Sequence, residues 1–419
     1  MRRATAPHEA ARTSGASRLL ERLTRKTTSG RYIPEIDGLR FVSIALVLLY
    51  HEAGYFQFNF RGAYTPGPDA DVLGIVVGTG HHGVELFFMI SGFVLALPFA
   101  AHYLAAARPV RLRAYYLRRV TRLEPPYFLA MIAFFVLRLV TDHQGLATLL
   151  PHLLASLGYV HNQVFAAQPI INIVAWSLEI EVQFYVVAPL LAMVFAIRNL
   201  LVRRGLILAA MLLASALFRP DLENDRWALS LLNFVQFFLI GLLIADVYIV
   251  DWNQAPTLSW RWDLVALIGW PAVLLVWVRD WGTALLFPPL ALLLFAAAFR
   301  SRLSRWFLTN PWITVIGGMC YSIYLLHYLM ISALVHVTGA IGRSPIFGVH
   351  MLVQFALLTP IILLVSLVYF VLIERPCMDR DWPRKLAQAC RRVVRWRTLQ
   401  RPALAEMVDS LDADGAPAP

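Results

Sequence analysis

The chain has 419 residues, of which 59% are hydrophobic and 15% are charged, and its mean hydropathy is +0.62. A soluble domain is roughly 45–50% apolar and about 25% charged, so this composition excludes an ordinary soluble globular protein. The formal net charge of +11 does not indicate a nucleic-acid partner, because the basic residues are distributed by membrane side, as described below.

Apolar blocks of 16–25 residues recur along the chain and are long enough to cross a hydrocarbon core of roughly 30 Å as helices. They lack two-residue alternation, which favours helices over a closed barrel. We therefore predict an all-α, polytopic membrane protein with about ten transmembrane helices. The expected spans are 39–58, 83–104, 123–141, 175–197, 205–218, 227–250, 263–278, 283–299, 312–338 and 348–373.

The segment 145–160 is also apolar, but it is short and contains Pro151 and His152. We interpret it as an interfacial or re-entrant piece, and a full span remains the alternative.

The basic residues test the number of spans, because cytoplasmic loops carry an excess of Lys and Arg. With a cytoplasmic N-terminus and ten spans, 31 of the 37 basic residues lie in or next to cytoplasmic segments. An eleventh span would place a C-terminal segment with nine basic residues outside. The sequence thus predicts an even number of spans, two cytoplasmic termini and a bacterial inner or plasma membrane.

Three regions follow from this topology. Residues 1–30 form a basic tail without the pattern of a cleavable signal, and 31–378 form the transmembrane domain. Residues 379–419 form a cytoplasmic tail: 384–402 suit an interfacial helix, 403–419 are expected to be disordered, and a second soluble domain is not expected there. The three cysteines have no metal-ligand spacing, and no metal site is predicted.

The first span carries ionisable residues that lipid disfavours, which makes them functional candidates. Eleven positions separate Arg40 from His51, so the two share a helix face and lie about 16 Å apart along the axis. Asp37 precedes Arg40 by three residues and is expected to pair with it. A neutral His51 would suit a general base for an acceptor hydroxyl. The structural alternatives are a buried histidine and an interfacial arginine.

Polar residues continue into the second span and the loop after it. Glu85 and Ser91 lie in the second span, where Ser91 with its neighbouring glycine also suits close helix packing. In the loop, Arg118, Arg119 and Arg122 fall within about one helical turn. Guanidinium groups so arranged could hold the phosphates of coenzyme A, and contact with lipid headgroups is the alternative.

The fourth and ninth spans add two further groups. Ser177, Glu181 and Tyr185 are spaced by four residues and share one face, next to Trp176. Tyr321, Tyr324 and Tyr328 form a stripe in the ninth span, with His327 beside it, and a packed aromatic stripe is the structural alternative.

Seven blocks, in this order, resemble the acyltransferase 3 family of membrane acyltransferases over residues 31–378. They are the I-x-x-I-D-G-L-R opening, the R-x10-H pair, G-V-x-L-F-F-x-x-S-G-F, R-x-x-R, W-S-L-x-x-E-x-x-F-Y, G-x-x-x-Y-S-x-Y-L-x-H and E-R-P. They fall at Ile33–Arg40, Arg40 with His51, Gly83–Phe93, Arg119–Arg122, Trp176–Tyr185, Gly317–His327 and Glu374–Pro376. Cys320 departs from the serine or small residue expected at its position.

The resemblance implies a ten-helix core and an enzyme that moves an acyl group, chiefly acetyl, from acyl-CoA to a hydroxyl of a saccharide, lipid-linked sugar or macrolide. The expected catalytic residues are His51, Arg40, Asp37 and Glu181, and the expected donor contacts are Arg118, Arg119 and Arg122. The expected substrate contacts are Glu85, Ser91, Trp176, Ser177, Tyr185, Tyr324 and His327. No tightly bound cofactor is implied, since acyl-CoA is a co-substrate.

A secondary transporter or flippase is the main alternative, because it would tolerate the same intramembrane charges. Transporters often contain inverted repeats with paired broken helices, and we find no such repeat. A structural or sensor protein fits the density of buried ionisable residues less well.

Overall fold

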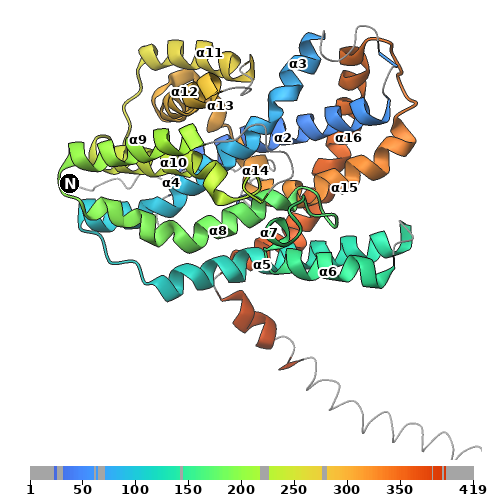
Figure 1. Cartoon of the computed structure of the whole chain (residues 1–419), viewed down its shortest axis with the longest axis horizontal. Helices are drawn as coiled ribbons and strands as arrows, with labels where there is room; N and C mark the ends of the chain where they lie inside the picture. Colours follow the sequence, from blue (N-terminus) through green and yellow to red (C-terminus); the bar gives the residue numbers. More distant parts are fainter. Residues whose placement is uncertain are drawn as a thin grey trace, which may run out of the picture.

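The computed structural model describes residues 23–25, 32–60, 63–64, 71–141, 145–217, 226–275, 281–379, 381–388 and 391–392. Every regular element in these ranges is helical, which confirms the predicted all-α class (Figure 1).

The helices follow the predicted spans closely. The first half of the chain contains α2 (Pro34–Asn59), α3 (Val72–Gly78), η1 (Thr79–His81), α4 (His82–Ala105), α5 (Leu112–Thr141), α6 (Leu146–Leu157), α7 (His161–Phe165), α8 (Ala175–Leu191), η2 (Ala192–Ala196) and α9 (Leu200–Leu217). The second half contains α10 (Leu231–Val250), α11 (Trp260–Leu275), α12 (Trp281–Arg300), α13 (Arg302–Leu308), α14 (Pro311–Gly318), α15 (Cys320–Thr338), α16 (Phe347–Tyr369), η3 (Phe370–Glu374) and α17 (Arg375–Cys377).

Within the described residues, eight helices are long and apolar enough to cross a membrane, and the bent pair α12 and α13 would make a ninth. The chain is therefore a multi-pass membrane protein. The remaining predicted span, 263–278, corresponds to α11, which has 16 residues. Ten spans with two cytoplasmic termini remain a prediction.

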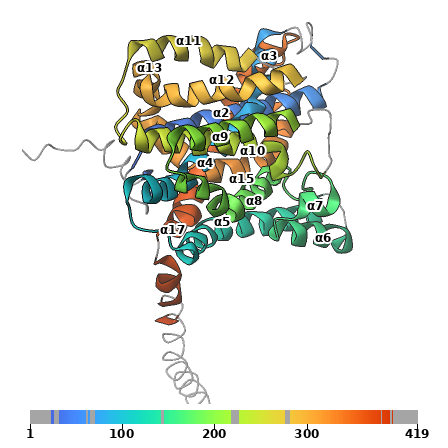
Figure 2. The same cartoon turned by 60° about the vertical axis from the view of Figure 1, so that its left-hand side comes forward.

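The helices form a bundle with α2 and α4 in its middle (Figures 1 and 2). The helices α11 and α12 lie at one edge of the bundle, and α5 and α6 lie at the opposite edge. The most extensive helix contact joins α4 to α10. It depends on Gly92, where a Cβ atom would overlap the backbone of Phe238, so the small residue allows close packing as expected.

The expected span 312–338 is divided in the structure. The helix α14 ends at Gly318 and α15 begins at Cys320, with Met319 between them. Gly317 packs against α2 so closely that a Cβ atom there would overlap the carbonyl oxygen of Asp37. This contact sets α14 against the helix that carries Asp37 and Arg40.

We expect Gly317→Ala to lower the free energy of unfolding by about 1–3 kcal/mol or more, because the added methyl group must displace backbone. Thermal unfolding in nanodiscs measures the effect. Gly54→Ala in α2 is the matched control, since no atom lies within 4 Å of a Cβ placed there. Equal melting temperatures for the two variants would contradict the assignment of Gly317 as a close-packing position.

The segment 145–160 runs back along α5. The Tyr127 hydroxyl donates to the Ser156 carbonyl over 3.0 Å, and the Tyr159 hydroxyl donates to Glu124 over 3.2 Å. Glu124 lies 17 residues from the end of α5 at Thr141, or about 25 Å along the helix. The segment thus returns along most of the length of α5, and its two alternatives, a re-entrant piece and a full span, remain predictions.

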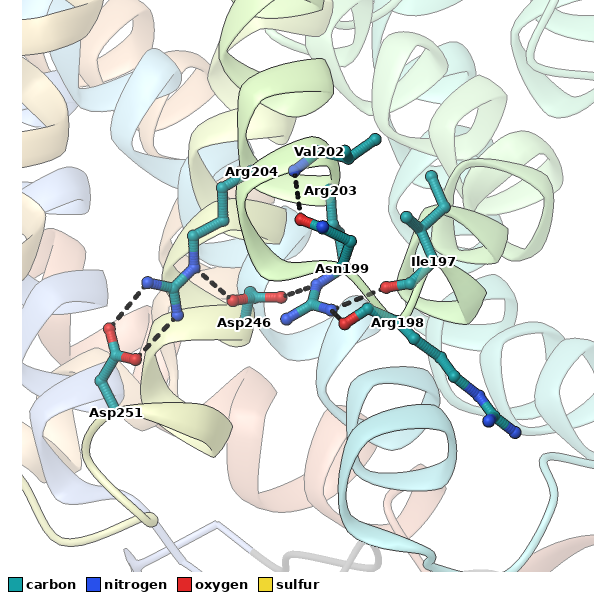
Figure 3. A network of polar contacts seen from close by, with 8 residues as sticks. All are labelled: Ile197, Arg198, Asn199, Val202, Arg203, Arg204, Asp246 and Asp251. Atoms are coloured by element: carbon teal, nitrogen blue, oxygen red, sulfur yellow. Dashed lines mark hydrogen bonds and ion pairs between the residues drawn. The ribbon is translucent and has the colours of Figure 1, made fainter.

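A buried ion network joins α9 to α10 (Figure 3). Arg203 and Arg204 both donate to the Asp246 carboxylate, and Arg204 also pairs with Asp251 at 2.9 Å. The side chain of Asp246 is fully buried and that of Arg203 is 3% exposed. Arg203 and Asp246 therefore each offset the free-energy cost of burying the other's charge.

The two tails are described only in part. Arg25, within the predicted N-terminal tail, donates to Asp37 over 3.0 Å and so contacts the transmembrane domain. In the C-terminal tail, residues 382–388 are helical. The predicted disordered segment 403–419 lies outside the described residues.

Candidate functional site

A cavity of about 230 Å³, here the central cavity, lies among α2, α4, α5, α8 and α15. Each helix supplies polar side chains to it. They are Arg40 from α2, Ser91 from α4, Tyr115, Arg118, Arg119 and Arg122 from α5, Ser177, Glu181 and Tyr185 from α8, and Cys320, Tyr321 and Tyr324 from α15. The structure thus brings most of the predicted site residues together.

The part of the cavity formed by α5 is strongly basic. Arg119 donates to the Tyr115 carbonyl over 2.7 Å, and its guanidinium group lies 3.5 Å from the centre of the Tyr115 ring. Within the described residues, the buried Nε atoms of Arg119 and Arg122 have no hydrogen-bond partner. Buried charged donors normally have partners, so this wall is suited to an anionic ligand.

The Arg40 guanidinium group is held by Asp37, as the three-residue spacing predicts. The two side chains pair at 2.6 Å, and Asp37 also pairs with Arg25 at 3.0 Å. Asp37 is fully buried and is not among the residues that line the cavity. Its contribution is to orient Arg40.

Hydrogen bonds order the wall formed by α4, α8 and α15. The Ser91 hydroxyl donates to Glu181. The Tyr324 hydroxyl donates to the Val174 carbonyl, so Ser177, 2.6 Å away, is the donor to the Tyr324 oxygen. The spacing of Ser177 and Glu181 places both on the cavity side of α8.

His51 does not line the central cavity. It forms a hydrogen bond with His327, with 3.0 Å between His51 Nδ1 and His327 Nε2. His327 Nδ1 lies 2.8 Å from the Tyr324 carbonyl and 3.0 Å from the Ile323 carbonyl. A carbonyl only accepts, so Nδ1 is the protonated nitrogen of His327 and Nε2 accepts from His51. Neutral His51 therefore carries its proton on Nδ1 and an unprotonated Nε2, the nitrogen that a general base requires.

Three ring contacts surround these two histidines. The His51 ring packs edge-on against Tyr50 and Tyr328, with centroids 5.3 and 5.4 Å apart. Tyr324, which lines the central cavity, lies 6.0 Å from His327. His51 is thus linked to the lining residue Tyr324 by hydrogen bonds: His51 bonds His327, and His327 bonds the Tyr324 carbonyl. Its partner is His327, whereas Arg40 pairs with Asp37.

Two predicted substrate contacts lie elsewhere. Glu85 bonds His82 Nδ1 at 2.6 Å, and Trp176 packs against Phe234 with ring centroids 5.5 Å apart. Neither residue lines the central cavity. Burial against neighbouring helices accounts for both positions.

One group among the described residues has the geometry to hold a metal ion. Ligand atoms of His81, His82 and Glu85 lie within 4.8 Å of one another. The pair His82 and Glu85 is also satisfied as a hydrogen bond, with His82 stacked on Phe287 at 4.3 Å.

Sequence reasoning did not assign three tyrosines of the cavity wall to the site. Tyr115 lies four residues before Arg119 of the R-x-x-R block and Tyr321 begins the Y-S-x-Y block, so a signal was available for both. Tyr159 comes from the segment 145–160, with φ at +54°, and no motif marks it. Its position depends on the fold of α6 against α5.

The fold and the cavity define a multi-pass membrane protein with an interior cavity lined by arginines. The family model described as "Acyltransferase domain" matches residues 33–371. The chain belongs to this family, which confirms the resemblance seen in the motifs.

Three relatives illustrate the similarity. A Staphylococcus aureus (strain COL) protein, provisionally named as an O-acetyltransferase, is 23% identical over 76% of this chain and 53% of its own length. O-acetyltransferase OatA of Staphylococcus aureus (strain NCTC 8325 / PS 47) is 22% identical over 73% and 52%. A Bacillus subtilis (strain 168) protein, provisionally named as a peptidoglycan O-acetyltransferase, is 27% identical over 48% and 31%.

The chain spans about half the length of the curated relatives it matches most fully. No solved structure matches it.

Proposed function

We propose that this protein is an integral membrane O-acyltransferase that moves an acyl group, chiefly acetyl, from acyl-CoA to a hydroxyl of a saccharide in the bacterial cell envelope. The observation that supports the proposal most is the central cavity. It has arginines along α5, and its lining residue Tyr324 is hydrogen-bonded through its carbonyl to His327, the partner of His51. The small volume of the cavity, about 230 Å³, favours a narrow pantetheine arm with a short acyl group.

The donor is proposed to bind with its phosphates against Arg118, Arg119 and Arg122. The buried Nε atoms of Arg119 and Arg122, which have no partner in the described chain, would then bond phosphate oxygens. Arginine suits this role because its donors match phosphate geometry.

His51 is proposed to act as the general base at the acceptor. Its Nε2 takes the proton of the acceptor hydroxyl as that oxygen bonds to the thioester carbonyl carbon. The carbon–sulfur bond then breaks, and the proton passes from His51 to the departing thiolate, which leaves as free coenzyme A. His327 positions the His51 ring through the 3.0 Å hydrogen bond. The hydrogen bond from Ser91 to Glu181 orders the cavity wall formed by α4 and α8.

A saccharide acceptor fits the name of the Bacillus subtilis relative, which is provisionally called a peptidoglycan O-acetyltransferase. An acyl-His51 intermediate is the alternative to direct transfer, since imidazole is also a nucleophile. Ping-pong kinetics would support the intermediate, and a required ternary complex would exclude it.

Purified protein in nanodiscs, supplied with radiolabelled acetyl-CoA and a cell-wall saccharide extract, tests the proposal. We expect free thiol release that depends on the acceptor and label that moves to the saccharide. If label binds but no thiol forms with any acceptor pool, the enzyme proposal fails. Proteoliposome uptake of the label would then favour the transporter alternative.

A second test concerns the arginines of α5 that are proposed to bind the phosphates of the donor. We expect Arg122→Ala to raise the KM for acetyl-CoA by about tenfold or more, because a charge-assisted bond contributes roughly 1.5–3 kcal/mol. Steady-state kinetics with varied acetyl-CoA measure this change. Arg113→Ala is the control, since Arg113 is exposed on the same helix and does not line the cavity. An unchanged KM in Arg122→Ala would contradict the phosphate role.

A further inference from the structure

A second cavity, here the surface cavity, adjoins the central one. Its volume is about 520 Å³, within the range of roughly 300–1,000 Å³ that small-molecule sites occupy. The first half of α5 forms one wall, and residues 377–379 and 381–384, after the last long helix, form the other. Arg118 and Arg122 line both cavities, so the two meet at these arginines.

The second wall is fixed in place against α5. The Trp382 indole nitrogen donates to the Thr121 carbonyl over 2.8 Å. Cys377 and Met378, which also line the surface cavity, are buried. The segment after the transmembrane domain is thus folded onto the donor arginines at this point.

The charges of the surface cavity favour an anion. Its basic lining residues are Arg118, Arg122 and Arg384. Of its two acidic residues, Asp379 is neutralised by Lys385 at 2.5 Å, while Asp381 lies 3.9 Å from Arg384. The Arg384 side chain is 86% exposed, so a ligand in the cavity can reach it.

We propose that the surface cavity binds the nucleotide end of coenzyme A, with Arg384 contacting the phosphate on its ribose. This inference rests on the proposed acyl-CoA donor. Coenzyme A is a linear molecule in which a ribose-phosphorylated adenosine, a pyrophosphate and a pantetheine arm follow one another. The surface cavity, the shared arginines and the central cavity follow one another in the same order.

Within this arrangement, Arg118 and Arg122 hold the pyrophosphate where the cavities meet. The pantetheine arm passes into the central cavity toward Tyr324. The ribose phosphate remains in the surface cavity, where Arg384 is the basic lining residue that the central cavity does not share. Arg384 therefore makes the protein specific for a donor that carries this phosphate.

A lipid headgroup offers phosphate of similar chemistry, because arginines at a membrane surface also bind anionic lipids. The two sources differ in one respect. A nucleotide site discriminates coenzyme A from its form without the ribose phosphate, whatever the lipid. A lipid site responds to the anionic lipid content of the bilayer.

Equilibrium binding of acetyl-CoA and of 3′-dephospho-acetyl-CoA tests the inference. The wild-type protein, Arg384→Ala and the control Arg391→Ala are measured in nanodiscs of zwitterionic lipid and of zwitterionic lipid with anionic lipid. Arg391 is exposed in the same tail and lines neither cavity.

We expect wild type and Arg391→Ala to bind acetyl-CoA about tenfold more tightly than the dephosphorylated donor. This difference is the affinity that one charge-assisted hydrogen bond to the ribose phosphate contributes. Arg384→Ala should bind acetyl-CoA about tenfold more weakly and the dephosphorylated donor as wild type does, in both lipids. Equal binding of the two donors by wild type, or discrimination kept in Arg384→Ala, overturns the inference. An Arg384 effect seen only with anionic lipid assigns the cavity to a headgroup instead.

These outcomes are separate from the donor proposal itself. If wild type binds neither donor, acyl-CoA is not the ligand, and the proposed function and this inference both fail. If wild type binds both equally, the donor proposal stands and the role of Arg384 fails alone.

Discussion

His51→Ala is expected to reduce acyl transfer about 10²- to 10⁴-fold, the range that a general base contributes. The reason is the tautomer that His327 imposes: with its proton on Nδ1 toward His327, His51 has an unprotonated Nε2 to take the acceptor proton. The donor arginines are on another helix, α5. The dissociation constant for acetyl-CoA should therefore remain close to that of wild type.

Acceptor-dependent thiol release and acetyl-CoA binding, measured on the same nanodisc samples, check this result. His336→Ala is the matched control, because His336 lies on α15 with His327 but is exposed. Loss of donor binding together with loss of transfer would point to misfolding or to a donor role for His51. Full activity in a folded His51→Ala protein would remove His51 from the mechanism.

Asp246→Asn is expected to lower the free energy of unfolding by about 3–5 kcal/mol, as when one partner of a buried ion pair is removed. The substitution leaves Arg203, whose side chain is 3% exposed, without its buried counter-charge (Figure 3). Denaturation in mixed micelles, followed by intrinsic fluorescence, measures the change.

Asp251→Asn tests the same network at its exposed end. The Asp251 side chain is 42% exposed, and an exposed pair contributes about 0–1 kcal/mol. The double variant Arg203→Met with Asp246→Leu should recover most of the stability, since neither charge is then buried. Equal effects of Asp246→Asn and Asp251→Asn would show that burial does not determine the strength of this network.

The packing of α10 links the ion network of Arg203, Arg204 and Asp246 to the central cavity. The helix α10 makes the most extensive contact with α4, and α4 supplies Ser91 to the central cavity. A loosened α9–α10 pair should therefore lower activity by way of stability, with the KM for acetyl-CoA of the folded fraction unchanged.

Much of the fold could be read from local patterns. Apolar block length identifies membrane helices because each must span the bilayer on its own, and ten helices or helix pairs correspond to the ten predicted spans. The break at Met319 escaped this reasoning, because no Asp, Glu, Lys, Arg or Pro interrupts residues 312–338. It reflects the packing of Gly317 on Asp37.

Within the site, helical spacing was sufficient where both partners lie on one helix. It predicted the pair of Asp37 and Arg40 and the common face of Ser177, Glu181 and Tyr185. It did not show that Glu85 pairs with His82 on its own helix, or that Trp176 packs against Phe234 of α10, so that neither lines the central cavity. Periodicity describes the faces of one helix but not the helix that each face meets.

The sequence alone determined the class of protein, the family and the residues around which the site is built, because hydropathy and short motifs are local properties. The tertiary structure decided three further points: the pairing of His51 with His327 across 276 residues, the contribution of Tyr159 from the segment 145–160 to the central cavity, and the surface cavity closed by residues 377–379 and 381–384. Each depends on contacts between distant segments, which form only when the helices pack together.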